Sequence, residues 1–308
     1  MSIIKRIAIS KKMKKNINIV KKMTGKMKFD ENMVNVNWKR VRFICNFGYQ
    51  FMPKEKGIKF EKIDLDGISA IMSIPKVVLS DGIILYIHGG GFVSGSAKST
   101  KGYCSMLAKY TQCRVVSIDY RLSPEYEYPC ALDDCFKAYR EIQKLYPNSK
   151  IAVVGESAGG NLCFALTVRC INNDVMPPSC IVSHSGVFDF TGSLDRDYDI
   201  DDFTVTTGVY KAMKSLYSPN NSMSNPEISP IFYKDISKFP PTVFTCDFKE
   251  TVKIDSVEMY KKMEKYGIDV TLYEYENTFH AFAPIGTMAL ETTQLLEENA
   301  EFIKKYIS

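Results

Sequence analysis

A serine flanked by glycines lies between a predicted strand and a predicted helix, where its hydroxyl could act as a nucleophile. The segment 155–160 reads Gly-Glu-Ser-Ala-Gly-Gly and follows the apolar run 151–154. Neighbours that lack a Cβ atom allow a sharp, strained turn that lifts the serine hydroxyl above the edge of a sheet. Small residues at this spacing also occur in ordinary turns, so the pattern alone is weak evidence. We predict Ser157 as the nucleophile, provided that the chain also supplies a base and a carboxylate.

The chain has three histidines that could serve as the base. His88 precedes the serine inside a glycine run, His184 ends a predicted strand, and His280 follows the last predicted strand. In hydrolases that use such an elbow, the acid and then the histidine come after the serine. We therefore predict His280 as the general base and keep His184 in reserve. The alternative for His280 is a loop histidine held by backbone hydrogen bonds, and a structural role would also explain His184.

Three glycines after a buried strand could stabilise negative charge. Residues 89–91, all glycine, follow the apolar run 82–87. Attack on an ester carbonyl creates an oxyanion, and backbone N–H groups can converge on it only where side chains are absent. Losing one such donor costs about 3 kcal/mol of transition-state stabilisation. We predict the N–H groups of Gly90, Gly91 and Ala158 as donors. A flexible turn or a phosphate loop would also use glycines, but no Lys-Ser or Lys-Thr pair ends this run.

Alternating strand-like and helix-like segments must position these groups. Short alternating runs at 58–65 and 68–74 flank Asp66-Gly67 and predict an antiparallel hairpin. After it, apolar runs alternate with segments of helical spacing, which favours a mostly parallel sheet with helices on both faces. Strands are expected at 82–87, 114–119, 151–154, 180–183, 242–245 and 270–275, and helices at 102–110, 131–146, 161–171, 254–266 and 287–306.

Length and composition are typical of a soluble protein with one large α/β domain. The chain has 308 residues, 45% of them hydrophobic, and no apolar run long enough to span a bilayer. Its nine cysteines lack metal-ligand spacing, and their odd number argues against a disulfide framework. The first twenty residues interleave lysine with isoleucine and lack a cleavage site, which is unlike a secretory signal. We expect a cytoplasmic location.

An N-terminal region and an insertion are expected to form a cap over this domain. Residues 1–55 should supply a basic arm and two amphipathic helices, over 13–27 and 30–51, and residues 56–308 the catalytic domain. Within the catalytic domain, the segment 189–235 is rich in Asp, Ser and Asn and interrupts the alternation of strands and helices. This segment predicts an inserted cap element.

The positive charge of the chain belongs to its N-terminal arm. Residues 1–28 hold ten Lys or Arg and no acid, and subtracting these ten from the net charge of +5 leaves −5 on the rest. One interpretation is a cap helix whose apolar stripe covers the mouth of the site and whose lysines are solvated. The other is weak, reversible contact with an anionic membrane surface. Nucleic acid is not expected as a partner, because the arm lacks interleaved aromatic residues and the remainder is acidic.

Four motifs, taken in order, resemble those of the hormone-sensitive-lipase family of α/β-hydrolase serine esterases. They are His88-Gly89-Gly90-Gly91, the block 119–129 that begins Asp-Tyr-Arg-Leu-Ser-Pro-Glu, the elbow 155–160, and His280. The resemblance covers about residues 80–285 and implies an α/β-hydrolase fold with a mostly parallel eight-stranded sheet, helices on both faces and a helical cap. It also implies hydrolysis of short- to medium-chain acyl esters without a cofactor. Because relatives often pair through the last strand, it further implies a homodimer.

The resemblance also implies a carboxylate after the seventh strand. In the family an Asp or Glu there precedes a helix that ends at a glycine, and counting back from Gly267 puts Glu250 at that position. Asp247 and Asp255 lie in the same segment and stay open as alternatives. A carboxylate bonded to the imidazole Nδ1 fixes the tautomer and stabilises the imidazolium that forms. The alternative for each acid is a solvated charge at the start of a helix. We predict Glu250 as the acid.

Together these residues predict a serine carboxylesterase that acts on a small-molecule ester through an acyl-enzyme. Phe92, Phe188 and Phe203 are predicted to line the acyl pocket, although each could equally belong to the core. The block 119–129 is expected to brace the oxyanion loop. Two rivals stay open: an amide, formamide or acetyl-group hydrolase with the same triad, and a non-catalytic small-molecule receptor resembling the plant gibberellin receptors. The presence of all three reactive residue types argues against the receptor.

Overall fold

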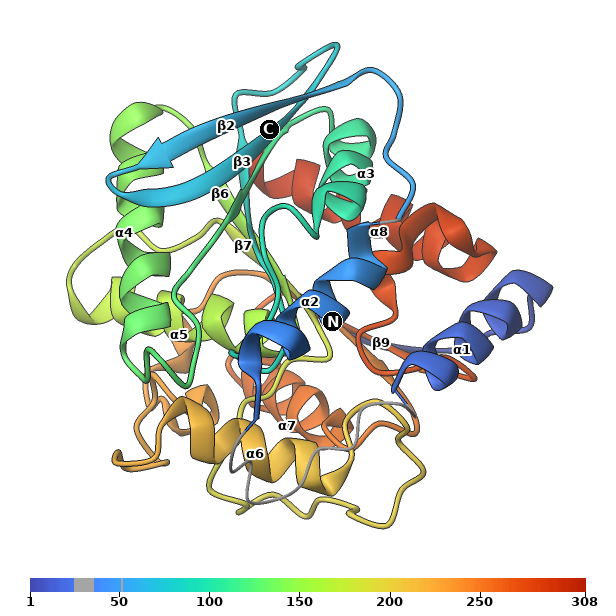
Figure 1. The fold of residues 1–308 in the computed structure, drawn as a ribbon. Helices are drawn as coiled ribbons and strands as arrows, with labels where there is room; N and C mark the ends of the chain where they lie inside the picture. The colour runs from blue at the N-terminus through green and yellow to red at the C-terminus, as the bar shows by residue number, and fades with distance from the viewer. Residues whose placement is uncertain (25–35, 51) are drawn as a thin grey trace.

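One nine-stranded sheet forms the centre of the molecule (Figure 1). The computed structural model describes residues 1–24, 36–50 and 52–308. The strand order is β1-β9-β8-β7-β6-β4-β5-β3-β2, in which β3 is antiparallel to both of its neighbours and all other neighbours are parallel. The strands are β1 Ser2–Ile7, β2 Ile58–Leu65, β3 Ile68–Pro75, β4 Ile83–Ile87, β5 Arg114–Ile118, β6 Ile151–Glu156, β7 Cys180–His184, β8 Thr242–Asp247 and β9 Val270–Glu276.

The central strands are apolar on both faces because helices cover both. Along β4, Ile83, Leu85 and Ile87 face one core cluster, and Ile84 and Tyr86 face the other. Helices α4, α5 and α7 pack on the first face, and α3 and α8 pack on the second (Figure 1). The helices are α1 Lys11–Thr24, α2 Trp38–Gln50, α3 Lys101–Thr111, α4 Cys130–Leu145, α5 Ala158–Asn172, α6 Thr207–Tyr217, α7 Lys253–Lys265 and α8 Leu290–Ile307, with short 3₁₀ turns at Pro230–Phe232, Ile236–Lys238 and Ala283–Met288.

The predicted α/β-hydrolase fold is confirmed, but within the described residues the sheet has nine strands rather than eight. The additional strand is β1, which pairs in parallel with β9 from Ser2–Thr271 to Ile7–Glu276. These residues were expected to belong to the basic arm, because residues 1–28 hold ten Lys or Arg and no acid. Charged residues are tolerated there because an edge strand leaves one side open to solvent. The pairing joins segments that are far apart in the sequence, and no local sequence pattern predicts it.

Strand β1 also changes the expectation for a dimer. Both edges of β9 are already paired, one with β8 and the other with β1. A homodimer formed directly through β9, as the family resemblance implied, is therefore incompatible with this sheet, and an edge-to-edge dimer at this end of the sheet would have to use β1. The homodimer itself stays a prediction.

Three helices from distant parts of the chain, α1, α2 and α6, lie over the end of the sheet where the loops that carry Ser157 and His280 emerge. The first two correspond to the helices predicted over 13–27 and 30–51. The parts of these predictions at 25–35 and at 51, including Met27, lie outside the described residues.

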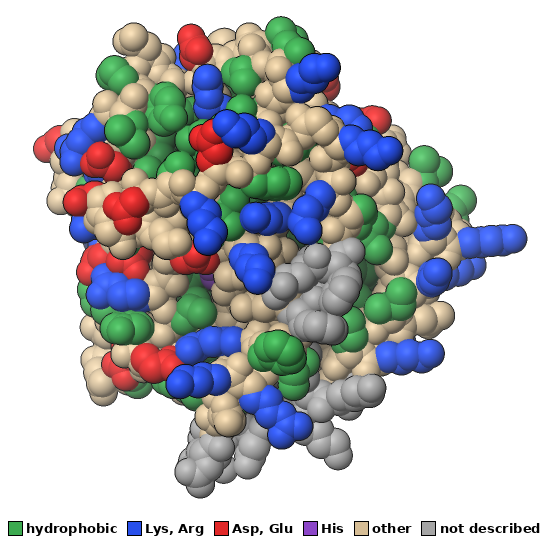
Figure 2. All heavy atoms as spheres, turned by 45° about the horizontal axis from the view of Figure 1, so that its top comes forward, with side chains coloured by type: hydrophobic (Ala, Val, Ile, Leu, Met, Phe, Trp, Pro, Cys, Tyr) green, Lys and Arg blue, Asp and Glu red, His purple; other side chains and the backbone are tan. Residues whose placement is uncertain are grey.

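Helix α1 is fixed to the body of the protein at its start. The Ser10 hydroxyl accepts the Met13 N–H at 3.1 Å, and the same hydroxyl donates to Glu291 of α8 at 2.7 Å. Met13 is fully buried, whereas the lysines of α1 are exposed. Figure 2 shows Lys and Arg side chains projecting from the right-hand edge of the molecule, where α1 lies. Among the described residues, no helix is both long and apolar enough to cross a membrane.

Candidate active site

Ser157 lies in a strained turn between β6 and α5. Its φ is 53°, a left-handed conformation that costs free energy for a residue with a side chain. The turn is possible because the residues two positions away on either side are glycines: a Cβ atom on Gly159 would lie 2.0 Å from the Ile87 carbonyl oxygen, and one on Gly155 would lie 2.5 Å from the Gly159 carbonyl oxygen. The Ser157 N–H donates to the His184 carbonyl at 2.8 Å. The strained turn between strand and helix that was predicted at Ser157 is therefore present.

His280 lies between the serine and a buried carboxylate. Its Nε2 is 2.8 Å from Ser157 Oγ, and its Nδ1 is 3.0 Å from Glu250 Oε2. The loop that carries His280 follows β9 and is held by two neighbouring strands. Thr278 donates its N–H to Asp247 at 2.9 Å, and the Ala281 N–H donates to Ser185 Oγ at 3.0 Å. The structure thus joins three residues that are far apart in the sequence into one hydrogen-bonded chain.

Burial and mutual attraction have opposite effects on the pKa values of Glu250 and His280. Burial raises the pKa of Glu250 to about 7, although the hydrogen bond from His280 lowers it. Burial lowers the pKa of His280, but the adjacent Glu250 carboxylate outweighs burial, so the pKa of His280 lies above its ordinary value of 6.5. The Glu250 carboxylate therefore favours the protonated imidazole, which is the state that a general base reaches during the reaction.

The two other candidate acids have structural contacts and do not bond His280. Asp247 accepts the N–H groups of Lys249 at 2.7 Å and Thr278 at 2.9 Å, so it shapes the loops around the site. Asp255 accepts the Phe188 N–H at 2.7 Å and pairs with Arg196 at 2.6 Å. Of the three carboxylates left open by the sequence, Glu250 is the one in contact with the imidazole.

The other two histidines are fixed elsewhere. His184 Nε2 lies 3.0 Å from the Tyr103 hydroxyl, and burial lowers the pKa of His184 to about 3. The His88 ring stacks on Tyr120 with 4.2 Å between centroids, and burial lowers the pKa of His88 to about 4. Both rings are therefore neutral at ordinary pH, and neither is bonded to Ser157.

The glycine loop presents backbone donors beside the serine. Gly90 and Gly91 have φ values of 107° and 62°, and a Cβ atom on Gly90 would lie 2.5 Å from the Ser94 carbonyl oxygen. Within the described part of the chain, the N–H groups of Gly90, Gly91 and Ala158 donate to no protein acceptor. These three groups are free to bind an oxyanion.

Glu156, next to the nucleophile, fastens the glycine loop to the elbow. Its carboxylate accepts the Gly89 N–H at 2.8 Å and the hydroxyl of Tyr86. Burial raises the pKa of Glu156 to about 7, and the hydrogen bond from Tyr86 opposes this rise. The acid that follows Gly155 therefore has a structural use that the sequence pattern alone did not indicate.

The block 119–129 braces the loop as expected. Asp119 accepts the Ala97 N–H at 2.7 Å, the Tyr120 hydroxyl donates to the His88 carbonyl at 2.7 Å, and the Ser123 N–H donates to the Phe92 carbonyl at 2.9 Å. These bonds run along both sides of the glycine run. They hold the backbone that presents the free N–H groups.

A cavity of about 340 Å³ opens over Ser157 and His280. Its wall is mostly apolar and comes from the cap helices, the insertion and the loop after β9. The main apolar lining residues are Val20 and Met23 of α1, Trp38 and Val41 of α2, Val205, Val209, Met213 and Leu216 in and before α6, and Phe279, Ile285 and Met288. The C-terminal part of the apolar stripe of α1, at Val20 and Met23, thus faces the cavity, which favours the first interpretation of the arm, whereas Met13 and Ile17 pack in the core.

The three phenylalanines predicted for the acyl pocket do not line this cavity, so that prediction is wrong. Phe92 is fully buried and stacks on Tyr217, with ring centroids 3.7 Å apart. Phe188 is fully buried against Phe164, with centroids 4.5 Å apart. Phe203 lies outside the lining and packs under Lys21 of α1, whose Nζ is 4.8 Å from the ring centroid. The direction of each ring is set by packing, and proximity in sequence to the catalytic loops does not predict it.

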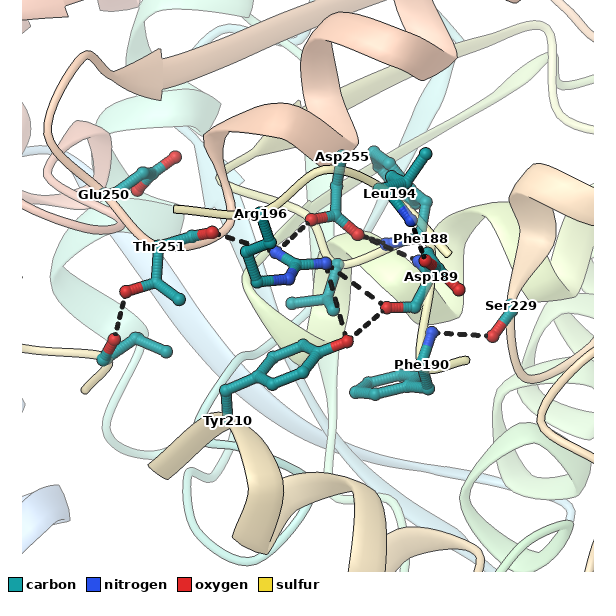
Figure 3. Close-up of polar contacts among 12 residues, drawn as sticks. Phe188, Asp189, Phe190, Leu194, Arg196, Tyr210, Ser229, Glu250, Thr251 and Asp255 are labelled. Carbon is teal, nitrogen blue, oxygen red and sulfur yellow. Dashed lines mark hydrogen bonds and ion pairs between the residues drawn. The ribbon is translucent and has the colours of Figure 1, made fainter. Parts of the chain in front are cut away.

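Sequence reasoning also missed two arginines that attach the cap to the catalytic loops. Arg42 of α2 donates to the Val93 carbonyl at 2.7 Å, beside the glycine loop. Arg196, in the insertion after β7, donates to the Thr251 carbonyl at 2.9 Å, beside Glu250 (Figure 3). A signal for Arg196 was present, because it is the one basic residue in the acidic stretch 189–202.

The sequence of the chain is similar to those of known hydrolases and esterases. Residues 84–284 match the profile of a family described as alpha/beta hydrolase fold. An esterase from Acinetobacter venetianus is 28% identical over 82% of this chain and 84% of its own length.

Solved structures extend the likeness to nearly the whole chain. An esterase from the bacterial hormone-sensitive lipase family is 25% identical, with a TM-score of 0.89 over 98% of this chain and all of that one. A hormone-sensitive lipase from a metagenome library is 26% identical, with a TM-score of 0.87 over 98% of this chain and all of that one. The chain belongs to the α/β-hydrolase fold family, within its hormone-sensitive-lipase branch of carboxylic ester hydrolases.

Proposed function

We propose that the protein hydrolyses short- to medium-chain acyl esters by nucleophilic catalysis, with Ser157 as nucleophile, His280 as general base and Glu250 as the acid of the triad. The observation that carries the proposal is the unbroken contact from Ser157 Oγ to His280 Nε2 at 2.8 Å and from His280 Nδ1 to Glu250 at 3.0 Å. This arrangement has the hydrogen-bonding order that acyl transfer requires.

The reaction follows from these contacts. His280 Nε2 takes the Ser157 proton as Oγ attacks the ester carbonyl carbon, and the carbonyl π electrons move to its oxygen. The N–H groups of Gly90, Gly91 and Ala158 bind this oxyanion. When the tetrahedral intermediate collapses, the imidazolium protonates the departing alcohol, and an acyl-serine is left. Water, deprotonated by His280, then attacks the acyl-serine, and the acid is released as Ser157 regains its proton.

The cavity supports a short- to medium-chain acyl group in the substrate. Its apolar wall suits an alkyl group, because burying each CH₂ contributes about 0.8 kcal/mol. At about 340 Å³ it lies near the lower end of volumes typical of small-molecule sites. We therefore expect p-nitrophenyl butyrate to be a better substrate than p-nitrophenyl acetate or p-nitrophenyl palmitate. The acetyl group would leave part of the apolar wall without contact, and the palmitoyl chain would be too long for the cavity.

The test compares ester turnover by the wild type and by Ser157→Ala. We expect kcat to fall at least about 10³-fold in the variant with folding unchanged, because truncation removes only the nucleophilic oxygen. Equal turnover by the two proteins would contradict the proposal. Activity toward p-nitroanilides that matches the ester activity would favour an amide hydrolase with the same triad, and tight ligand binding without turnover by the wild type would favour a receptor.

A further inference from the structure

Thr251, the residue after Glu250, is bound through all of its polar groups to the cap insertion. Its N–H donates to Asp202 Oδ2 at 2.9 Å, and its hydroxyl donates to the Val205 carbonyl at 2.7 Å. Its carbonyl accepts from Arg196 at 2.9 Å, as Figure 3 shows. The three partners lie between β7 and α6. The insertion thus holds the backbone immediately C-terminal to Glu250 through every polar group of Thr251.

Asp202 connects this loop to the wall of the cavity. Its second oxygen, Oδ1, accepts the N–H groups of Thr204 and Val205, both at 2.9 Å. Thr204 and Val205 line the cavity that opens over Ser157. The Asp202 side chain is buried, so one carboxylate fixes the cavity wall with one oxygen and the loop of the catalytic acid with the other.

We propose that Asp202 is a positioning residue for the reaction, which acts through Thr251 to hold Glu250 at hydrogen-bonding distance from His280. This inference rests on the proposed triad. It makes the cap insertion part of the catalytic apparatus as well as a cover over the substrate. A shift of the insertion would move the Glu250 loop, and displacements of about 1 Å in such groups can cost about 100-fold in rate.

The charge of Asp202 adds a second, separable effect. The acidic groups that face the His280–Glu250 pair are Asp202 from the insertion, Asp247 from the end of β8 and Glu156 from the end of β6. After the hydrogen bond and attraction of Glu250 itself, Asp202 contributes the next largest attraction that raises the pKa of His280. Removing the charge of Asp202 should therefore lower the pKa of His280.

The chain offers a matched control within the same insertion. Residues 189–191 and 202–204 both read Asp-Phe-Thr. In each copy the aspartate accepts the N–H and the hydroxyl of the threonine two residues later. The Asp189 carboxylate makes its remaining bonds to Ser193 and Leu194, within its own turn, whereas Asp202 reaches Thr251.

The experiment compares Asp202→Asn with Asp189→Asn, using p-nitrophenyl butyrate across pH. An asparagine at 202 can keep its oxygen toward Thr204 and Val205, but its NH₂ then faces the Thr251 N–H, so the link to the acid loop is lost. We expect kcat to fall about tenfold in Asp202→Asn with little change in KM, and the acid limb of kcat/KM to move to lower pH. Asp189→Asn should leave both the rate and the limb at their wild-type values.

A third variant separates position from charge. Thr251→Val removes the hydroxyl bond to Val205 but keeps the Asp202 carboxylate, so kcat should fall several-fold while the acid limb stays in place. Matching kcat values and pH profiles for Asp202→Asn and Asp189→Asn would overturn the inference. If Asp202→Asn does not fold, as judged by circular dichroism, an unchanged kcat in Thr251→Val would overturn it instead. Full activity in Glu250→Gln would overturn the proposed triad rather than this inference alone.

Discussion

Two arginines of the cap hold opposite ends of the active site, and they do so in different surroundings. Arg42 of α2 donates to the carbonyls of Val93 and Ser123 at 2.7 and 2.8 Å and pairs with Glu125, next to the oxyanion loop. The side chains of Arg42 and Glu125 are 21% and 47% exposed. Arg196 donates to the Thr251 carbonyl and pairs with Asp255 at 2.6 Å, and both of these side chains are fully buried.

The difference shows how each half of the cap contributes. An exposed ion pair adds little to stability because water competes with it. A buried pair carries a large desolvation cost, so loss of one member leaves a charge in the interior without compensation. The insertion is thus attached to the core by a buried ion pair on the side of the site that carries Glu250. The N-terminal half is attached on the oxyanion side by contacts that solvent reaches.

The largest expected effect comes from the acid itself. Glu250→Gln keeps the shape of the side chain but removes the charge that stabilises imidazolium, so kcat should fall by about 10³- to 10⁴-fold. Asp247→Asn, which alters a loop contact and not the triad, is the comparison variant. A smaller loss in Glu250→Gln than in Asp247→Asn would show that the acid has been assigned to the wrong carboxylate.

The pH dependence of kcat/KM tests the same assignment of Glu250. A general base must be neutral in the free enzyme, so kcat/KM should rise with pH through the pKa of His280. Because Glu250 raises that pKa, the midpoint of the wild type should lie above 6.5. In Glu250→Gln burial acts without the carboxylate, and the midpoint of the residual activity should move to lower pH. A midpoint that stays in place would mean that Glu250 does not control the imidazole.

Removal of the buried cation should cost the most stability. Arg196→Met leaves Asp255 charged in the core, and we expect a loss of about 3–5 kcal/mol in the free energy of unfolding, measured by urea denaturation. Since Arg196 also bonds the carbonyl of Thr251, the residue after Glu250, kcat should fall as well. A destabilisation no larger than that of Arg42→Met would remove the contrast between the two halves of the cap.

Loss of the partly exposed cation, Arg42, should be milder. Arg42→Met removes charge-assisted bonds to two carbonyls and a partly exposed ion pair, for which we expect about 1–2 kcal/mol. Arg42→Met should impair turnover more strongly than it lowers stability, because Val93 adjoins the oxyanion loop. Added salt should reduce the difference in the free energy of unfolding between Arg42→Met and the wild type. It should leave the corresponding difference between Arg196→Met and the wild type nearly unchanged.

The smallest effect is expected from the lysines on the outer face of α1. Lys11, Lys14 and Lys15 are exposed, so their joint change to Gln should alter the free energy of unfolding by less than about 0.5 kcal/mol per site. Turnover of a water-soluble ester should not change. The same variant tests the predicted membrane contact: weaker sedimentation with anionic vesicles than the wild type would support it, and equal sedimentation would argue against it.

The catalytic loops could be read from the sequence because their chemistry constrains the backbone locally. A serine at a φ of 53° and donors from Gly90 and Gly91 require glycine neighbours, and these leave a pattern within a few residues. The order of the motifs supplied His280, and the family resemblance supplied Glu250. The alternation of apolar runs gave the parallel sheet, since each strand is buried on both faces by the helices around it.

Contacts between distant segments were decided by the tertiary structure. Strand β1 pairs with β9 across almost the full length of the chain, and Arg196 meets Asp255 only when the insertion folds back on α7. Phe92 and Phe188 turned into the core because neighbouring rings, and not their places in the sequence, determine the direction in which a side chain packs. The sequence by itself therefore determined the reactive groups and the backbone that presents them. The cap, its anchors and the cavity wall depend on long-range packing, which leaves no local periodic signal.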